Sequence, residues 1–383
     1  MIERLGNPLV AKIGPSAIRT MYERRRETSI DLSMGQPTLM PDYEPFAQAV
    51  NWVRDNGTLY APNAGFPELR QAAATIYGGA CNKTAAHVCV TNGSQEGIYL
   101  AIKALLDPAI DEVLLTDPTY PSYQRCCAME GVKHRFVQLR PEDGFTITAD
   151  ALLGAIEPAT RMIVFGSPSN PTGSVMAESE IRKLADALHE RKGPPVWVVV
   201  DEVYRELTFS SAPYATLLDH YPYAIGLQSL SKSCALTGMR IGFAIGPADA
   251  IAVMTRVHTL TLMSVNVFAQ RVALAILGEP SKLRAHFDWY ARQRALVLET
   301  AASAGLRIIE PHGAFYLLVR LPERWVDSEK AAADLLERFD VVTVPGHVFG
   351  RATQSYLRIS WCAQPNRVVA GLTRIAEFCA ATC

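Results

Sequence analysis

Seven short apolar runs in the middle of the chain, separated by segments with helical patterning, constrain the fold most. They are residues 87–91, 112–116, 135–139, 161–165, 196–201, 224–229 and 241–246. Several are almost continuously apolar, which is typical of strands covered on both faces. An intervening segment, 177–192, has Ile181, Leu184 and Leu188 at helical spacing. The alternation predicts an α/β fold with a doubly wound, mostly parallel seven-stranded sheet between helices.

The pattern changes near residue 279, where a smaller α+β domain is expected to begin. A long helix is predicted over 281–305, ending at Gly305. Two strand-like runs, 313–321 and 355–362, surround a helix over 328–339. Because 383 residues are many for one hydrophobic core, two domains are favoured. The predicted division is 1–45 (N-terminal segment of the small domain), 46–278 (large domain) and 279–383 (C-terminal small domain).

Charge and composition exclude several classes of protein. The net charge is -1, so nothing in the balance favours nucleic acid or an anionic membrane as a partner. No apolar run approaches the length of a bilayer span, and the N-terminus lacks the apolar core of a signal peptide. We therefore expect a cytoplasmic protein whose eight cysteines are reduced thiols. Their spacing does not resemble a zinc site, so we expect no metal.

Polar side chains follow the predicted strands, at the edge where open α/β sheets bind ligands. They are Gly93, Ser94 and Gln95 after the first strand, Tyr120 after the second, Asn170 after the fourth, Asp201 at the end of the fifth and Lys232 after the sixth. A chain that needed only turns there would have no special use for a lysine and an aspartate. The arrangement predicts a binding site at this edge.

The residue types at this edge suit one cofactor, pyridoxal phosphate. A lysine that attacks a carbonyl must lose its proton, which a desolvated or cation-rich pocket around Lys232 promotes. A strand-end carboxylate, Asp201, can pair with a protonated ring nitrogen. Small residues and free N–H groups at 93–95, before a predicted helix, can seat a phosphate. Arg240 can share the pocket with that anion.

The run "SLSKSCALTGMRIG", residues 229–242, resembles the lysine signature of the class I/II aminotransferases, the fold-type I pyridoxal-phosphate enzymes. Four further segments match that family in the correct order: "YAPNAGFPELRQA", "SPSNPTG", "DEVYRELTF" and "YLRIS". The resemblance covers essentially the full length. It implies the fold-type I architecture and a homodimer whose site is built at the subunit interface.

The resemblance implies a role for each candidate residue around the cofactor ring. Lys232 would carry the cofactor as an internal aldimine and then move the Cα proton. Asp201 would pair with the ring nitrogen. Tyr204 and Asn170 would hydrogen-bond the ring oxygen, and Tyr120 would stack on the ring.

The resemblance also implies how the two anionic groups are held. The phosphate would be bound by Gly93, Ser94, Gln95, Ser229, Ser231 and Arg240, with Tyr60 reaching in from a second subunit. Arg358 would clamp the substrate carboxylate, aided by the Gly35 backbone and Asn170. Plain structural uses stay open, because Asp201 could cap a helix and Tyr120 and Tyr204 could be core aromatics.

The function implied is transfer of an amino group between an L-amino acid and a 2-oxo acid by a ping-pong mechanism. A lyase on the same scaffold, eliminating a C–S group or forming a cyclopropane, is the alternative. Relatives of this fold also serve as sensor domains in transcription regulators. The residues before "DLSMGQP" are too few for an added DNA-binding region, which disfavours that role.

Substrate choice is constrained by one departure from the family. In a large bacterial subgroup that handles aspartate, a lysine stands where this chain has Gln95, which puts aspartate in doubt. Ile18 and Met21 are predicted to line the substrate pocket, and the segment 259–270 to add an apolar wall. These residues favour an apolar or aromatic substrate side chain, although they could equally be packing residues.

Overall fold

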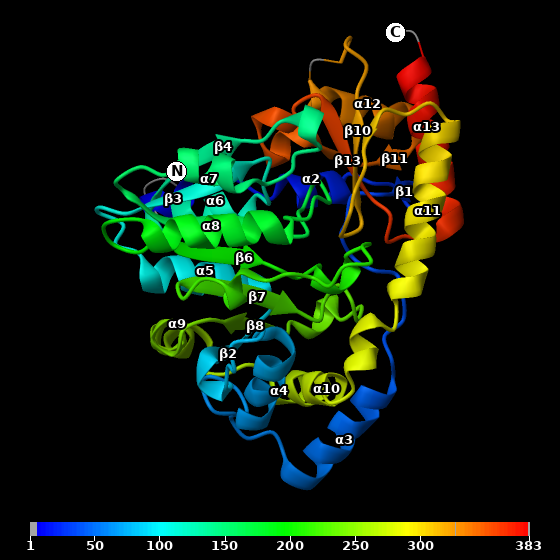
Figure 1. Cartoon of the computed structure of the whole chain (residues 1–383). Helices are drawn as coiled ribbons and strands as arrows, with labels where there is room; N and C mark the ends of the chain where they lie inside the picture. Colours follow the sequence, from blue (N-terminus) through cyan, green and yellow to red (C-terminus); the bar gives the residue numbers. More distant parts are fainter. Residues whose placement is uncertain (1–5, 326, 382–383) are drawn as a thin grey trace.

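The computed structural model describes residues 6–325 and 327–381, and its largest sheet contains all seven predicted strands (Figure 1). The strands are β2 (Val88–Thr91), β3 (Glu112–Asp117), β4 (Lys133–Gln138), β5 (Thr160–Gly166), β6 (Trp197–Asp201), β7 (Ala224–Ser229) and β8 (Gly242–Ile245). Their order across the sheet is β2-β8-β7-β6-β5-β3-β4. Only β8 runs antiparallel to its neighbours in this sheet, so the mostly parallel sheet is confirmed.

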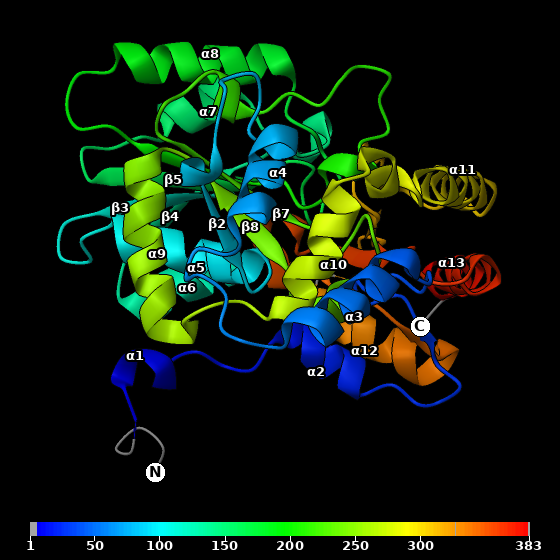
Figure 2. The same ribbon diagram turned by 90° about the horizontal axis from the view of Figure 1, so that it is seen from below.

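Helices cover both faces of this sheet, which explains why the strands are so continuously apolar. One face packs on α5 (Ser94–Leu105), α6 (Ser122–Glu130) and α9 (Ala248–Leu262). The other packs on α4 (Pro67–Tyr77), α7 (Ala149–Gly154), α8 (Glu178–Glu190) and α10 (Val267–Leu277), as Figures 1 and 2 show. Within β2, Val88 and Val90 belong to one core and Cys89 to the other. Successive side chains of a strand point to opposite faces of the sheet, so alternate residues of β2 pack into the two cores.

The second, smaller unit is an antiparallel sheet with helices. Its strand order is β12-β13-β10-β9. The strands are β9 (Ile308–Ile309), β10 (Tyr316–Arg320), β12 (Val344–Pro345) and β13 (Tyr356–Ser360), with helices α11 (Phe287–Ser303), α12 (Ser328–Phe339) and α13 (Pro365–Ala380). These elements share a separate hydrophobic core. The unit therefore has the α+β character expected of the C-terminal part of the chain.

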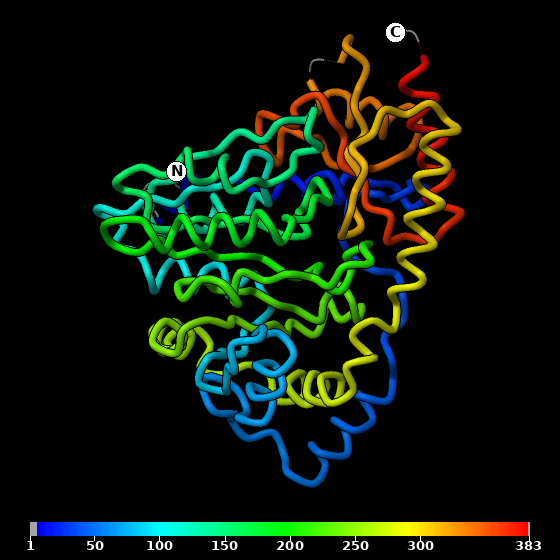
Figure 3. The backbone as a smooth tube through the Cα atoms, in the orientation of Figure 1, coloured from blue at the N-terminus to red at the C-terminus, as the bar shows by residue number. Residues whose placement is uncertain are grey.

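The N-terminal segment begins beside α6 of the large unit and then runs along this smaller unit, as the tube in Figure 3 shows. It contains the short helices α1 (Pro8–Ala11) and α2 (Ala17–Glu23) and the strand β1 (Ile30–Asp31), which pairs in parallel with β11 (Val341–Val342). The next helix, α3 (Glu44–Asn56), contacts α10 of the large unit instead. The chain therefore passes from the smaller unit to the large unit between β1 and α3. The exact domain boundaries stay a prediction.

The helix predicted over 281–305 is interrupted near its start. A 3₁₀ turn at Pro280–Arg284 comes first, and α11 begins only at Phe287. Lys282 of the turn pairs with Asp42 and Glu44, which ties the turn to the start of α3 rather than to the axis of α11. The end is as predicted, because Gly305 follows α11 with φ +67.

The structure bears on two expectations, reduced cysteines and the lack of a membrane-spanning helix. All seven described cysteines are free thiols; the eighth, Cys383, lies outside the described residues. Among the helices of the described residues, none is both long and apolar enough to cross a bilayer.

Candidate active site

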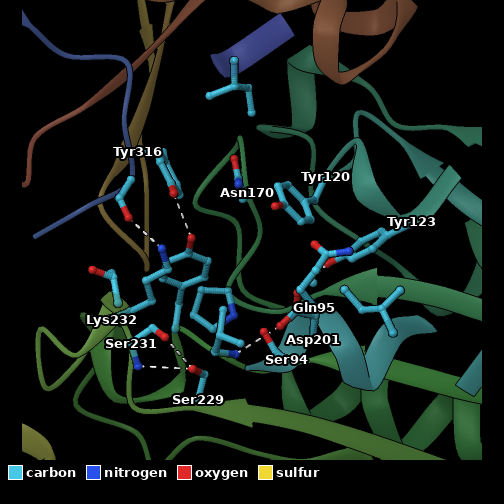
Figure 4. Close-up of a pocket in the computed structure, with 18 of the residues that line it drawn as sticks. Ser94, Gln95, Tyr120, Tyr123, Asn170, Asp201, Ser229, Ser231, Lys232 and Tyr316 are labelled. Atoms are coloured by element: carbon cyan, nitrogen blue, oxygen red, sulfur yellow. Dashed lines mark hydrogen bonds between the residues drawn. The ribbon is translucent and has the colours of Figure 1, made fainter. Parts of the chain in front are cut away.

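A hollow of about 1000 Å³, open to solvent, lies where the carboxyl ends of β5, β6 and β7 face β10 and β13 of the smaller unit. It brings together most of the candidate residues: Gly35, Ser94, Gln95, Tyr120, Asn170, Asp201, Tyr204, Ser229, Ser231, Lys232, Arg240 and Arg358. Figure 4 shows Lys232, Asp201, Asn170 and Tyr120 arranged around this space. Residues far apart in the chain therefore converge at the predicted edge of the sheet.

Lys232 follows β7 and projects its ammonium group into the pocket. Its Nζ donates a hydrogen bond of 2.6 Å to the Gly35 carbonyl oxygen. Burial lowers the pKa of Lys232 to about 8, and the positive charges of Arg358 and Arg240 act in the same direction. A lysine with such a pKa is partly neutral near physiological pH, as a nucleophile or a base must be.

Asp201 ends β6 and is only 7% exposed. Its Oδ2 accepts a hydrogen bond of 2.9 Å from the Tyr123 hydroxyl. Burial raises the pKa of Asp201 to about 6, while the bond from Tyr123 opposes the shift. Within the described chain no lysine or arginine forms an ion pair with this carboxylate. A cationic ring nitrogen in the pocket is a fitting partner for it.

The charge of Asp201 is expected to destabilise the cofactor-free protein. The folded state keeps the Asp201 proton up to about pH 6, whereas an unfolded chain releases it near pH ~4. The cost is therefore absent below about pH 4, grows between about pH 4 and the folded pKa, and stays constant above it. Asp201→Asn should raise the free energy of unfolding by roughly 2–3 kcal/mol above pH 7 and by about half of that at pH 5. Urea unfolding at several pH values measures this; a gain independent of pH would contradict it.

Gly93 and Arg240 shape an anion site at the start of α5. Gly93, at φ +78, is the N-cap residue of α5 and makes no side-chain cap, so no capping side chain satisfies the first N–H groups of the helix, whose residues Ser94 and Gln95 line the pocket. A Cβ at position 93 would collide with the Arg240 guanidinium, so glycine permits their close approach. Arg240 itself has φ +52, a left-handed conformation that is uncommon for arginine.

The Arg240 guanidinium has hydrogen-bonding capacity left for a ligand. It donates to the carbonyl oxygens of Thr237 (3.0 Å) and Asn92 (3.3 Å) and forms no ion pair with a carboxylate of the described residues. Ser229 Oγ lies 2.9 Å from Ser231 Oγ, and both line the same end of the pocket. A helix N-terminus, two hydroxyls and a free cation form a donor set that suits a phosphate.

Arg358 lies in β13 and is 1% exposed. Its guanidinium stacks on the Tyr316 and Phe349 rings, 4.4 and 4.9 Å from their centroids. Nη1 donates to Asn170 Oδ1 over 3.2 Å, and Nη2 donates to the Ser33 carbonyl oxygen. Nε has no hydrogen-bond partner in the described chain. A buried cation without a carboxylate is costly unless a ligand supplies one, so Arg358 suits a substrate carboxylate.

Two tyrosines complete the walls of the pocket. Tyr204, in the turn after β6, is buried, and its hydroxyl oxygen lies 2.8 Å from that of Tyr316. Tyr120 contacts Tyr123 edge-on, with ring centroids 5.6 Å apart. The Tyr120 ring thus presents a flat apolar wall, as stacking on a planar ligand requires.

Several candidates do not reach this pocket within one chain. Tyr60 is 84% exposed and lies outside it. Ile18 lines the pocket, but Met21, one helical turn on, is buried in the core of the smaller unit, so its predicted place was wrong. No residue of 259–270 lines the pocket either. That segment spans the end of α9 and the start of α10, whose buried residues pack against the sheet.

Two tyrosines of the pocket lining, Tyr123 and Tyr316, are not among the residues predicted from the sequence. Tyr123 follows Tyr120 by three residues, so helical spacing could have indicated it. Tyr316 enters through strand pairing, because β10 lies beside β13 with Leu318 opposite Arg358. That register is not readable from the sequence.

Comparisons with known proteins agree with this geometry. The family model for aminotransferase class I and II matches residues 27–375. The aspartate aminotransferase of Pyrococcus horikoshii is 31% identical over 96% of this chain and 95% of its own length. The probable N-acetyl-LL-diaminopimelate aminotransferase of Bacillus subtilis is 31% identical over 98% of this chain and 96% of its own length. The aspartate/prephenate aminotransferase of Thermus thermophilus is 30% identical over 96% of this chain and 95% of its own length.

Solved structures show the same fold. The Thermus thermophilus aspartate aminotransferase with maleate has a TM-score of 0.90 and 30% identity, covering 97% of this chain and 99% of that one. A tetra mutant of that enzyme complexed with tryptophan also has a TM-score of 0.90 at 30% identity, with coverages of 97% and 99%. These relatives are all named as aminotransferases, so the lyase alternative receives no support.

The donor set of the pocket fits pyridoxal phosphate, the cofactor of this family. The anion site beside Gly93 at the start of α5 suits its phosphate. The Asp201 carboxylate, which has no cationic partner among the described residues, suits its ring nitrogen, and the partly neutral Lys232 amine suits its aldehyde carbon. Sequence, fold and pocket chemistry thus agree. The chain belongs to the class I and II aminotransferases and is a pyridoxal-phosphate-dependent transaminase.

Proposed function

We propose that this transaminase works through Lys232, Asp201 and Arg358, and that its amino donor carries an uncharged apolar or aromatic side chain. The observation that carries the proposal is the lining of the pocket. Its only cationic side chains among the described residues are Lys232, Arg240 and Arg358. Each has a use in the reaction, so none is left for a second carboxylate on the substrate.

The cofactor would be held at three points of the pocket. Its phosphate would lie among Ser94, Gln95, Ser229, Ser231 and Arg240, with Gly93 leaving room. Asp201 would pair with its ring nitrogen, Tyr204 and Asn170 would donate to its ring oxygen, and Tyr120 would cover its ring. When bound, pyridoxal phosphate supplies a sink for the electron pair left on Cα when a proton is removed.

Lys232 Nζ carries the proton in this scheme. A pKa of about 8 leaves part of the free amine neutral and able to accept the Cα proton. The Gly35 carbonyl oxygen accepts one Nζ–H bond and so limits where Nζ can point. The same amine would hand that proton on along the same face of the planar cofactor, so one group can serve as both base and acid. Donor and acceptor acids would use the site in turn, which gives ping-pong kinetics.

Arg358 fixes the substrate through its α-carboxylate. The rings of Tyr316 and Phe349 hold the guanidinium, and Asn170 accepts from Nη1. A bidentate pair with a carboxylate would set the orientation of the Cα–H bond relative to Lys232. Asn170, which contacts Arg358, and Gly35 also line the pocket, and Asn170 and the Gly35 backbone would contact the carboxylate as well.

The side-chain end of the pocket supports an uncharged donor. Ile18 and Met34 are apolar residues of the pocket lining, and Gln95, placed above near the phosphate, lines the same pocket. Relatives named for aspartate and prephenate share the scaffold, and a mutant of one of them was solved with tryptophan. Gln95 provides no positive charge for a dicarboxylate.

Steady-state rates with a panel of amino donors test this substrate class. We expect kcat/KM for phenylalanine or leucine to exceed that for aspartate by at least ~10-fold, because an apolar wall binds a charged group poorly. A preference for aspartate would remove the substrate proposal and leave the transaminase itself intact. Gln95→Lys is the matched variant, and it should shift the preference toward aspartate.

We also propose a homodimer in which Tyr60 completes the phosphate site of the partner subunit. A single chain leaves Leu59, Tyr60, Leu260 and Met263 exposed, by 81%, 84%, 89% and 50%. Such large apolar side chains in solvent support a covering partner.

Mixing two defective homodimers tests the shared site. Tyr60→Ala and Lys232→Ala chains should restore activity when they form hybrid dimers, because one of the two sites then has both residues intact. Gel filtration gives the oligomeric state. No recovery in hybrids of confirmed composition would contradict a crossing Tyr60.

The cellular setting follows from simpler features. We place the enzyme in the cytoplasm, which the free thiols of its described cysteines support. We also propose the division into residues 1–45, 46–278 and 279–383, which the change of sequence pattern near residue 279 supports.

A further inference from the structure

Tyr316 makes a contact that the roles above do not use. It stands on β10 of the smaller unit, yet its hydroxyl oxygen lies 2.8 Å from that of Tyr204, which follows β6 of the large sheet. Both side chains are buried, 2% and 5% exposed. Figure 4 shows the Tyr316 hydroxyl pointing down toward this contact on the lysine side of the pocket.

Either hydroxyl can donate in this hydrogen bond, because each is the other's only hydrogen-bond partner among the described residues. Tyr204 Oη is the one acceptor recorded for Tyr316 Oη in the described chain. The other surroundings of Tyr316 offer none: its hydroxyl lies against the Cα of Gly35, where a Cβ would collide with it, and Arg358 stacks on its ring. If Tyr316 donates to Tyr204, the Tyr204 proton remains free to point into the pocket.

A hydroxyl that accepts one hydrogen bond becomes a stronger donor of another, because the bonds polarise each other. Burial keeps the pKa of Tyr316 raised, to about 12, and that of Tyr204 well above its usual value, so both phenols stay protonated at working pH. The pair can therefore act as a chain of two donors.

We propose that Tyr316 is a positioning residue, which orients the Tyr204 hydroxyl and strengthens its hydrogen bond to the ring oxygen of bound pyridoxal phosphate. The proposal rests on the proposed role of Tyr204. Tyr316 touches neither the reacting atoms nor the cofactor in this arrangement; it acts through Tyr204. It also links the two units of the fold at the pocket.

The consequence is a shift in the proton equilibrium of the bound cofactor. Donation to the ring oxygen stabilises the deprotonated, more negative form of the lysine-linked cofactor. Losing that donation raises the pH midpoint at which the visible absorbance changes. A hydrogen bond to a charged acceptor corresponds to about one pH unit or more, and the partial loss of one to about half a unit.

Four holoenzymes test the inference by pH titration of their visible absorbance: wild type, Tyr316→Phe, Tyr204→Phe and the double variant. We expect Tyr204→Phe to raise the midpoint by about one unit and Tyr316→Phe by about half a unit. The double variant should match Tyr204→Phe alone, because Tyr316 acts only through Tyr204. Tyr316→Phe keeps the ring under Arg358, so KM for the amino acid should stay unchanged.

Each other outcome has a definite meaning. The inference is overturned if Tyr316→Phe leaves the pH midpoint unchanged. It is also overturned if the double variant has a midpoint higher than that of Tyr204→Phe by the full Tyr316→Phe shift. No shift in Tyr204→Phe overturns the proposed role of Tyr204 itself. Tyr221→Phe is the matched control, since it removes a buried hydroxyl bonded to the Val196 carbonyl oxygen at 2.9 Å, outside the pocket. That control should leave the midpoint where it is, and thermal melting confirms that all variants fold.

Discussion

Replacing Lys232 with alanine is expected to abolish transamination and the visible absorbance of the holoenzyme together. The amine is both the proposed anchor of the cofactor and its proton carrier, so no other group of the pocket can take over both tasks. The remaining pocket cations, Arg240 and Arg358, are guanidinium groups that do not lose a proton near neutral pH. We expect kcat to fall at least ~10⁴-fold. Absorbance spectra and steady-state rates measure the two effects.

A surface lysine provides the control for this variant. Lys183 is on α8 and pairs with Asp150 of α7, and its side chain is 50% exposed. Lys183→Ala should keep the spectrum and the rate of the wild type. A Lys232→Ala protein that retained both would contradict the central role of this residue.

Arg358→Lys is expected to produce the second-largest loss. Lysine keeps the charge but lacks the planar fork that pairs with a carboxylate and stacks between Tyr316 and Phe349. We expect kcat/KM for amino acids to fall roughly 10²–10³-fold. The loss should appear mainly in KM, while the affinity for the cofactor stays near that of the wild type. Cofactor titration and steady-state kinetics separate the two.

Arg320, exposed at the end of β10, serves as the matched control. Arg320→Lys should change neither parameter. An Arg358→Lys enzyme with unchanged KM would contradict the carboxylate clamp, and one that lost the cofactor instead would assign Arg358 to the phosphate.

The sequence predicts the sheet and most of the pocket because both depend on local patterns. Most strands of the large sheet are buried and apolar on both faces, as β2, β5 and β7 are, so a short apolar run marks one strand. The edge strand β4 is the exception. The residues after the strands converge because parallel strands bring their carboxyl ends to one edge. Lys232, Asp201 and Asn170 are found in this way, and the signature around Lys232 names the family.

Other features depend on contacts that no local pattern contains. Tyr316 meets Arg358 and Tyr204 only through the register of β10 with β13 and the packing of the two units. Ile18 and Met21 lie on the same short helix, yet one lines the pocket and the other fills a core. The turn at 280–284 leaves the helical axis because Lys282 pairs with residues 240 positions away in the chain.

One measurement tests the central claim most directly: the absorbance of the purified holoenzyme during a single half-reaction. Adding an amino acid without any acceptor should replace the visible band of the lysine-linked cofactor with that of its aminated form. A 2-oxo acid added afterwards should restore the original band, with one equivalent of amino acid formed per site. A band that never changes with any amino acid, or that changes while ammonia is released and no acceptor restores it, would contradict transamination at this site.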